Sequence, residues 1–426
     1  MSLSQHIKQV VPQRIKRTVR RILGLPNTNG AFLDFERAIR PESITLRKDI
    51  LKWVSTNEHD FDDFEQAEQF EASSSPIVKQ SYALTQEVRN QFRDKFSGNN
   101  DLRILIQLPP PSVSPGGYSL FSNLIDSLQF IGINTKSLDW HEPTAGALKD
   151  FEPSILLTSD DATYLNQIDW NEVGNFRKSH QLRIGLTASI QEYGNTPLNE
   201  RLEWARKNSI DFYYSFRSKE YVEAREEYKP FYEHQYEIIN IEFGANPLIY
   251  YSVPSVERDI DFSFLASINP VKWKRYFEYL KPVFSNHVGF IDGPGWSFAT
   301  DFKFKPKRDR YIYARTKVGL NLHLDEQINW ACELNERTYM LAACGVPQLI
   351  DNPRILHSRF SKESLFIAET PRDYEDLFMY MLENPAEAER RALRAQREVL
   401  ASHTTFHRAE TLVNALLRQG NSGVRA

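Results

Sequence analysis

The sequence predicts an α/β protein with two doubly wound domains in series. The chain has 426 residues, which is more than one hydrophobic core comfortably accommodates. In both halves, β-type apolar runs alternate with helical patterns, and this alternation is typical of βαβ units around a parallel sheet. We expect a mostly helical extension over residues 1–100, a first α/β domain over 101–250 and a second over 251–420.

The expected strands are short apolar runs bounded by Gly, Pro and polar residues. In the first domain they are residues 102–108, 134–138, 154–158, 182–186, 211–215 and 238–241. In the second domain they are residues 260–265, 287–291, 318–322, 347–350 and 365–368, with a helix expected over 271–280 and a basic loop over 292–311. Ligands of such sheets bind at the carboxyl ends of the strands, so the loops that follow them are where we expect a site.

Composition excludes several classes of protein. The hydrophobic share of 41% and the charged share of 25% are those of an ordinary globular protein, and a formal net charge of −4 does not favour nucleic-acid binding. Cys332 and Cys344 are the two cysteines, too few for a disulfide framework or a thiolate metal cluster. No apolar run approaches the roughly 18 residues of a membrane span, and the N-terminus lacks the core of a signal peptide. We therefore expect a cytoplasmic protein.

The first 25 residues are basic and amphipathic. They contain no acidic residue, and their basic residues are Lys8, Arg14, Lys16, Arg17, Arg20 and Arg21. Ile7, Val11, Ile15, Val19 and Ile22 recur at steps of three and four residues, which gives an apolar stripe beside the basic face. Such a helix can lie on an anionic membrane surface, or it can pack on the rest of the protein with its charges solvated. The pattern leaves both alternatives open.

Two groups of residues follow predicted strands of the first domain. Gly116 and Gly117 come after the first strand, where backbone N–H groups can approach a phosphate closely, although paired glycines also occur in ordinary loops. Asp160 and Asp161 follow the strand that ends at Thr158. A carboxylate at that edge can act as a general base, or it can cap the next helix.

The second domain resembles the C-terminal domain of GT-B glycosyltransferases. The resemblance is to the branch named for spore-maturation proteins, which is related to the family-4 branch. The segments that carry it are VGLNLH at 318–323, NERTYMLAACG at 335–345, the strand ending at Asp351 and ASHTTFHRA at 401–409, with EFGANP at 242–247 and RDIDFSFL at 258–265 upstream. It implies two Rossmann-like domains that face a cleft, the last helix packing back on the first domain. The C-terminal domain would then hold a nucleotide-sugar donor and the N-terminal domain the acceptor.

The resemblance places the donor's diphosphate at the turn that contains Arg337. A guanidinium near a helix N-terminus suits a phosphate because both its fork of donors and the helix dipole favour negative charge. The alternative is an ion pair between Arg337 and Glu333 or Glu336 on the surface. Glu333 also counts as a candidate donor contact, and the remaining donor-site candidates from these segments are Asn321, Asn335, Thr338 and Tyr339.

The group that would accept the acceptor's proton is less obvious. His323 ends a strand at the expected crevice and is a candidate beside Asp160 and Asp161, but it can equally be a packing histidine. One departure from the family stands at Met340, where related enzymes carry a glutamate thought to hold the donor's ribose. Histidines and acids show no zinc-like spacing, so we expect no metal and no cofactor beyond the nucleotide sugar.

Together these features predict a glycosyltransferase. It would move a sugar from a nucleotide-sugar donor to a glycan or a lipid-linked glycan, and the resemblance implies a role in bacterial cell-surface polysaccharide synthesis. The basic segment 1–25 would then place the enzyme on the inner face of the plasma membrane. Two alternatives stay open, a non-catalytic scaffold on a decayed GT-B domain, as Met340 suggests, and a GT-B-type sugar-nucleotide epimerase.

Overall fold

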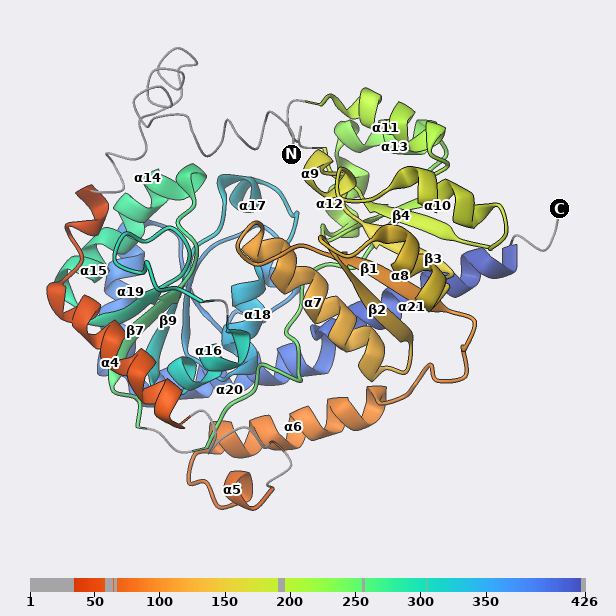
Figure 1. Cartoon of the computed structure of the whole chain (residues 1–426). Helices are drawn as coiled ribbons and strands as arrows, with labels where there is room; N and C mark the ends of the chain where they lie inside the picture. The colour runs from red at the N-terminus through yellow and green to blue at the C-terminus, as the bar shows by residue number, and fades with distance from the viewer. Residues whose placement is uncertain are drawn as a thin grey trace, which may run out of the picture.

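The computed structural model describes residues 34–57, 64, 67–190, 196–254, 257–303 and 305–422. The basic segment 1–25 therefore lies outside the described residues. Figure 1 shows two α/β units side by side, with the helices of the N-terminal extension along the second unit and below both. Each unit is built around its own parallel sheet, so the prediction of two doubly wound α/β domains is confirmed.

The first sheet has the strand order β2-β1-β3-β4-β5-β6, and all its neighbours pair in parallel. Its strands are β1 (Arg103–Leu108), β2 (Asn134–Asp139), β3 (Ile155–Thr158), β4 (Arg183–Thr187), β5 (Phe212–Ser215) and β6 (Ile238–Asn240). Most of these strands are largely apolar and buried, which is typical of strands covered on both faces, whereas the edge strand β2 carries exposed polar residues. The chain crosses to one side of β1 to form β2 and returns on the other side to form β3. The crevice at this switch point lies beside the loop that follows β1.

Helices cover both faces of this sheet. They are α7 (Pro115–Phe130), α8 (Thr144–Phe151), α9 (Ala162–Leu165), α10 (Trp170–Arg177), α11 (Leu198–Lys207), α12 (Lys219–Ala224), the short η2 (Glu226–Tyr228) and α13 (Lys229–Glu233). Helix α7 starts directly at the switch point. Ser114 caps it by accepting a hydrogen bond from the Gly117 N–H, and Pro115 occupies the first turn, where its missing N–H costs nothing.

The second sheet repeats this topology with the order β11-β10-β9-β7-β8, again all parallel. Its strands are β7 (Ile260–Leu265), β8 (Gly289–Asp292), β9 (Thr316–Asn321), β10 (Gln348–Asp351) and β11 (Phe366–Ala368). The helices that follow β8 to β11 are α16 (Pro306–Ala314), α17 (Asp325–Asn329), α18 (Glu336–Ala343), η5 (Leu356–Ser358), α19 (Pro371–Glu383), α20 (Pro385–Ser402) and α21 (Thr405–Ser422). Its switch point lies between β7 and β9.

Two local predictions in this domain were wrong. The helix expected over 271–280 is an irregular series of η3 (Pro270–Lys272), α14 (Trp273–Arg275), the π-helical η4 (Tyr276–Leu280) and α15 (Lys281–Asn286). Pro282 lies in the first turn of α15 and has no N–H to continue an α-helical ladder, which favours a wider turn before it. The basic loop expected over 292–311 becomes helix α16 from Pro306 onward.

Two helices hold the two domains together, and a third covers the edge of the second sheet. The last helix, α21, crosses to the first domain (Figure 1). Its Phe406 stacks there on Phe130 with ring centroids 4.5 Å apart. Helix α6 (Pro76–Phe92) packs along α20. Helix α4 (Pro41–Asn57) covers β8, the edge strand of the second sheet. The facing carboxyl ends of both sheets are thereby fixed on opposite sides of one cavity.

Candidate functional site

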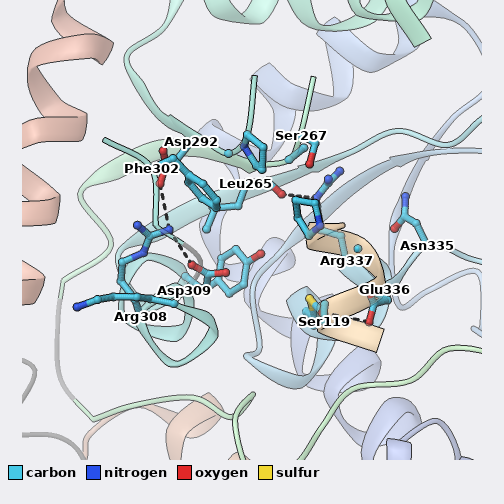
Figure 2. Close-up of a pocket in the computed structure, with 18 of the residues that line it drawn as sticks. Ser119, Leu265, Ser267, Asp292, Phe302, Arg308, Asp309, Asn335, Glu336 and Arg337 are labelled. Atoms are coloured by element: carbon cyan, nitrogen blue, oxygen red, sulfur yellow. Dashed lines mark hydrogen bonds and ion pairs between the residues drawn. The ribbon is translucent and has the colours of Figure 1, made fainter. Parts of the chain in front are cut away.

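A cavity of about 240 Å³ lies between the two domains. The first domain contributes the start of α7, with Pro115, Gly116 and Ser119. The second domain contributes the loops after β7 and β8, helix α16 and the start of α18. Figure 2 shows the side chains of these elements around one space. The two topological switch points thus share one cavity, as expected for a ligand that binds between doubly wound domains.

Arg337 lines this cavity and is half-buried. Its Nε donates to the backbone oxygen of Leu265 at 2.9 Å (Figure 2). Its Nη1 donates to Asn321 Oδ1 at 3.3 Å. The guanidinium also lies over the ring of Phe264, 4.8 Å from its centroid. No carboxylate among the described residues pairs with it, so the suggested ion pairs with Glu333 and Glu336 do not form. A cation held in this way leaves its charge available to an anion in the cavity.

The start of α18 is held by a network of buried polar side chains. Asn335 caps the helix, accepting from the Thr338 N–H at 3.1 Å while its Nδ2 donates to Asn321 Oδ1 at 2.8 Å. Asn335 itself lines the cavity, whereas Asn321 and Thr338 are fully buried behind it. These three predicted residues therefore orient the turn that carries Arg337, and Asn335 is the one of them that a ligand can reach.

His323 belongs to the same network of buried polar side chains that holds the start of α18. Its Nδ1 lies 2.7 Å from Asp351 Oδ1, and its Nε2 lies 3.3 Å from the Asn335 N–H. The carboxylate therefore accepts from a protonated Nδ1 and the backbone N–H donates to Nε2, which describes a neutral imidazole. Burial lowers the pKa of His323, although Asp351 opposes that shift. Because the ring is fully buried and does not line the cavity, the structure places it as a support of α18.

Lys272 adds a second cation near Arg337. It follows β7, and its Nζ donates to the backbone oxygen of Leu322 at 2.8 Å. Burial, and next the charge of Arg337, lower the pKa of Lys272 to about 7. Lys272 itself does not line the cavity, and near neutral pH it adds only part of a positive charge to that of Arg337. The sequence analysis missed Lys272, since a single lysine in an Asn-Pro-Val-Lys loop carries no local signal.

Glu336 lines the cavity on the side that faces the first domain. Its carboxylate accepts from Ser119 Oγ of α7 at 3.4 Å, which links the two domains (Figure 2). Burial raises the pKa of Glu336 to about 7, although the hydrogen bond from Ser119 opposes that shift. No Lys, Arg or His in the described part of the chain pairs with it. Glu336 is thus a carboxyl group able to exchange a proton near neutral pH.

Replacing Glu336 by Gln is expected to remove a pH dependence of stability. The folded-state pKa lies above the ordinary value of 4.5, so the folded protein binds this proton more tightly than the unfolded chain. That contribution is fully present below about pH 4.5 and is lost as the pH rises to about 7. Over this window we expect the wild type to lose about 2 kcal/mol of unfolding free energy relative to Glu336→Gln, discounted because the side chain is partly exposed to the cavity. Urea unfolding of both proteins at several pH values measures this, and parallel profiles would contradict it.

A polar wall stands opposite Arg337 (Figure 2). Arg308 Nη2 lies 3.0 Å from Asp292 Oδ2 and 3.2 Å from Asp309 Oδ1, and all three residues line the cavity. Burial raises the pKa of Asp309 to about 6 in spite of Arg308. Gly293 follows Asp292 with a φ of +143°, and a Cβ there would lie 2.2 Å from the backbone oxygen of Ala266. Only glycine lets the loops after β7 and β8 approach each other this closely.

The paired glycines after β1 have different surroundings. Gly116 lines the cavity, and a Cβ on it would meet open space. Gly117 packs against the hydroxyl of Tyr164 and donates its N–H to Ser114, so it does not line the cavity. The N-terminus of α7, a helix of 16 residues, nevertheless faces the cavity through Pro115 and Gly116, and its dipole favours an anion there.

The two aspartates after β3 lie away from the cavity. Asp160 is buried and paired with Arg201 of α11, and it accepts from Thr187 Oγ1 at 3.1 Å. Asp161 caps α9, accepting from the Thr163 N–H at 2.7 Å. The structure therefore gives both carboxylates local partners, and the capping alternative describes Asp161.

The other predicted donor-site residues also lie outside the cavity. Glu333 is buried and paired with Arg217 of the first domain, while Gln327 donates to its carboxylate at 2.8 Å. Tyr339 is buried in the core of the second domain. Met340, in contrast, lines the cavity one turn after Glu336.

Within the described residues we looked for a metal site and for a membrane-spanning helix. No group of three or more His, Cys, Asp or Glu side chains in them is placed to hold a metal ion. None of the helices that the structure describes combines the length and the apolar character needed to cross a bilayer.

Comparison with known proteins bears on the second domain. Residues 282–414 match the family model described as glycosyl transferase-like. No curated protein sequence matches the chain. The polar wall after residue 292, Glu336, Arg337 and Met340 all fall inside the matched segment.

Solved structures share a distant overall similarity with the chain. The β-glucosyltransferase BGT of T4 phage in complex with UDP-glucose is 12% identical, with 73% of this chain and 96% of that chain covered and a TM-score of 0.45. HepE of Anabaena in complex with UDP-glucose is 10% identical over 74% and 100% of the two chains, with a TM-score of 0.45. A glycosyltransferase of Rickettsia africae is 12% identical over 74% and 98%, with a TM-score of 0.46. The resemblance of the second domain to glycosyltransferases is confirmed over residues 282–414, while the branch stays a prediction.

Proposed function

We propose that the protein is a glycosyltransferase whose second domain binds a nucleotide-sugar donor. The observation that carries this proposal is Arg337, a half-buried guanidinium without a carboxylate partner among the described residues, at the wall of an interdomain cavity. It lies inside the segment that matches the glycosyl transferase-like family. A site that keeps a cation unpaired in a partly buried position favours an anionic ligand, and a nucleotide sugar provides one in its diphosphate.

In this proposal, Arg337, Lys272 and the N-terminus of α18 together stabilise the leaving diphosphate. When the bond between sugar and diphosphate breaks, negative charge grows on the leaving phosphate, and fixed positive groups stabilise that charge. Arg337 would contact the phosphate directly, and the dipole of α18 acts in the same direction. Lys272 raises the positive potential behind Arg337. Because the cavity is enclosed by both domains, bound donor would be shielded from water, which limits its hydrolysis.

Glu336 is our candidate for the group that accepts the acceptor's proton. Asp292 and Asp309 also line the cavity, but each is paired with Arg308, whereas Glu336 has no cation partner in the described residues. It faces α7 of the first domain, where we place the acceptor. A carboxyl with a pKa near 7 suits general acid–base catalysis at neutral pH. We prefer Glu336 to His323, Asp160 and Asp161 because those three residues do not line the cavity and bond to residues of their own domains.

The acceptor and the setting are proposed on the sequence resemblance. It implies a glycan or lipid-linked glycan acceptor and a role in bacterial cell-surface polysaccharide synthesis. An anionic membrane surface would be contacted through the basic segment 1–25. Sedimentation with anionic vesicles, compared between the full chain and a chain without residues 1–25, tests that contact.

Binding of nucleoside diphosphates tests the donor site. Purified protein is titrated with UDP, GDP and ADP while its unfolding temperature is followed, since a ligand at 100 times its Kd adds roughly 2.7 kcal/mol of stability. The sugar nucleotide of the diphosphate that binds is then incubated with the protein, and the products are identified. Free nucleoside diphosphate together with a glycosylated acceptor or free sugar supports the proposal. An isomerised donor would instead indicate an epimerase, and an absence of binding and turnover would indicate a scaffold.

A further inference from the structure

The N-terminal helix α4 lies outside the family match, yet it reaches the wall of the cavity. It packs against the edge strand β8, where Ser43 Oγ accepts a hydrogen bond from the Gly289 N–H at 3.1 Å. Arg47 follows Ser43 by four residues, so it lies on the same face of the helix one turn further along. The side chain of Arg47 is 1% exposed and points to the end of β8.

Arg47 binds the carboxylate with which β8 ends. Its Nε donates to Asp292 Oδ1 at 2.9 Å, and its Nη2 lies 2.9 Å from the same oxygen and 2.8 Å from Asp301 Oδ1. The other oxygen of Asp292 contacts Arg308, which in turn contacts Asp309. A continuous chain of ionic contacts thus runs from α4 to the cavity, and its last three members line the cavity.

Arg47 balances the charge of the polar wall, which consists of Asp292, Arg308 and Asp309. Asp292 is fully buried, and a buried carboxylate is stable only when cations or hydrogen bonds compensate it. With Arg47 present, Asp292 has two cationic partners, and Arg308 can share its charge with Asp309. Without Arg47, Arg308 would be the remaining cation for both carboxylates. It would then be drawn toward Asp292, which changes the position of the guanidinium and of Asp309 in the cavity.

We infer that Arg47 is a positioning residue for the nucleoside end of the donor site, an inference that rests on the proposed function. The wall that it supports lies across the cavity from Arg337 (Figure 2). Carboxylates and a guanidinium there offer acceptors and donors to the hydroxyl groups and base edges of a nucleoside. Phe302 lies at this wall beside Asp292 and offers a ring to a base (Figure 2). The phosphates, in contrast, belong to the Arg337 end.

The test compares two probes that differ by the nucleoside. The full chain and its Arg47→Met variant are titrated calorimetrically with pyrophosphate and with the nucleoside diphosphate, UDP, GDP or ADP, that the wild type binds most tightly. We expect the variant to lose roughly tenfold or more in affinity for the nucleoside diphosphate, because a displaced wall misplaces its contacts. Its affinity for pyrophosphate should stay within about twofold of the wild type, since Arg337 is untouched. Arg47→Lys keeps the charge without the fork, so we expect an intermediate loss.

Val54→Ala is the matched control. Val54 is buried on the same helix in a separate apolar cluster, so its truncation weakens the packing of α4 without touching Asp292. It should lower the Tm and leave both affinities unchanged. Equal affinities of Arg47→Met and wild type for the nucleoside diphosphate, or an equal loss for both probes, would overturn the inference alone. A wild type that binds neither probe would overturn the proposed function, and the inference with it.

Discussion

Arg337→Ala is expected to lower the affinity for nucleoside diphosphates about 100-fold, equivalent to roughly 3 kcal/mol. The substitution removes the guanidinium of the cavity that has no carboxylate partner among the described residues, and hydrogen bonds to charged groups are worth about 1.5–3 kcal/mol each. Calorimetric titration of the two proteins with the same nucleoside diphosphate measures the effect. Turnover of the sugar nucleotide should fall in parallel, because the same contact stabilises the leaving diphosphate.

Two further proteins separate charge from geometry in this test. Arg337→Lys keeps a cation but not the planar fork, so its affinity should lie between those of the wild type and of Arg337→Ala. Arg372→Ala removes an exposed arginine of α19 that pairs on the surface with Asp376, and it should bind like the wild type. If Arg337→Ala binds nucleoside diphosphates as tightly as Arg372→Ala does, the cavity is not a diphosphate site.

Most of the strands were predictable because they are buried on both faces, whereas the edge strand β2 carries exposed polar residues. The run of β3 is apolar up to its last residue, and this pattern needs no tertiary information to be recognised. Every predicted strand range overlaps an observed strand. The segment 271–280 was predicted as one regular α-helix but is irregular, because Pro282, just beyond its expected end, favours a wider turn before it. The local sequence pattern thus indicated the order of the strands and helices, and a single proline changed the helix type of one segment.

The site was less predictable because most of its members are brought together across the chain. Arg337, Asn335 and Gly116 follow from motif and strand order. Glu336 gains its significance from Ser119 of the other domain, which no spacing within its own motif indicates. Arg47 and Asp292 are 245 positions apart, and their contact depends on how α4 packs on the sheet edge. Conversely, some residues of the matching motif, such as Tyr339, are buried in the core. The motif alone therefore does not distinguish residues that contact a ligand from residues that hold the site in place.

Arg201→Met is expected to cost about 3–5 kcal/mol of unfolding free energy at about pH 9, because it leaves a buried, ionised carboxylate without its cation. Arg201 pairs with Asp160 and also donates to the backbone oxygen of Ser189 at 2.9 Å. Burial raises the pKa of Asp160 to about 7 even beside this guanidinium. Urea unfolding compares the wild type with Arg201→Met. Glu203→Met on the same helix α11, where the side chain is exposed, is a control that should change little.

The pH dependence of this loss follows from the sign of the pKa shift. In the wild type, the stability linked to the protonated Asp160 is present below its ordinary pKa and is lost as the pH rises to about 7. Removal of Arg201 raises the folded-state pKa further, so the variant continues to lose stability above about pH 7, where the wild type no longer does. The difference in unfolding free energy between the two proteins should therefore widen from about pH 7 to about pH 9. A constant difference would mean that the lost contact to Ser189, and not the carboxylate, explains the destabilisation.

Two amide substitutions, Asp160→Asn and Glu336→Gln, decide whether Asp160 takes part in the chemistry. Asp160→Asn would lower kcat by a factor of about 100 or more if this carboxylate were the general base, even at temperatures where the variant is fully folded. Asp160 faces Arg201 and Thr187 and does not line the cavity, so we expect a lower Tm with a kcat close to that of the wild type. Glu336→Gln should show the opposite combination, a low kcat in a protein that is at least as stable as the wild type at neutral pH. Because the two substitutions make the same chemical change, the contrast between them assigns the proton acceptor to the cavity wall and the buried ion pair to the fold.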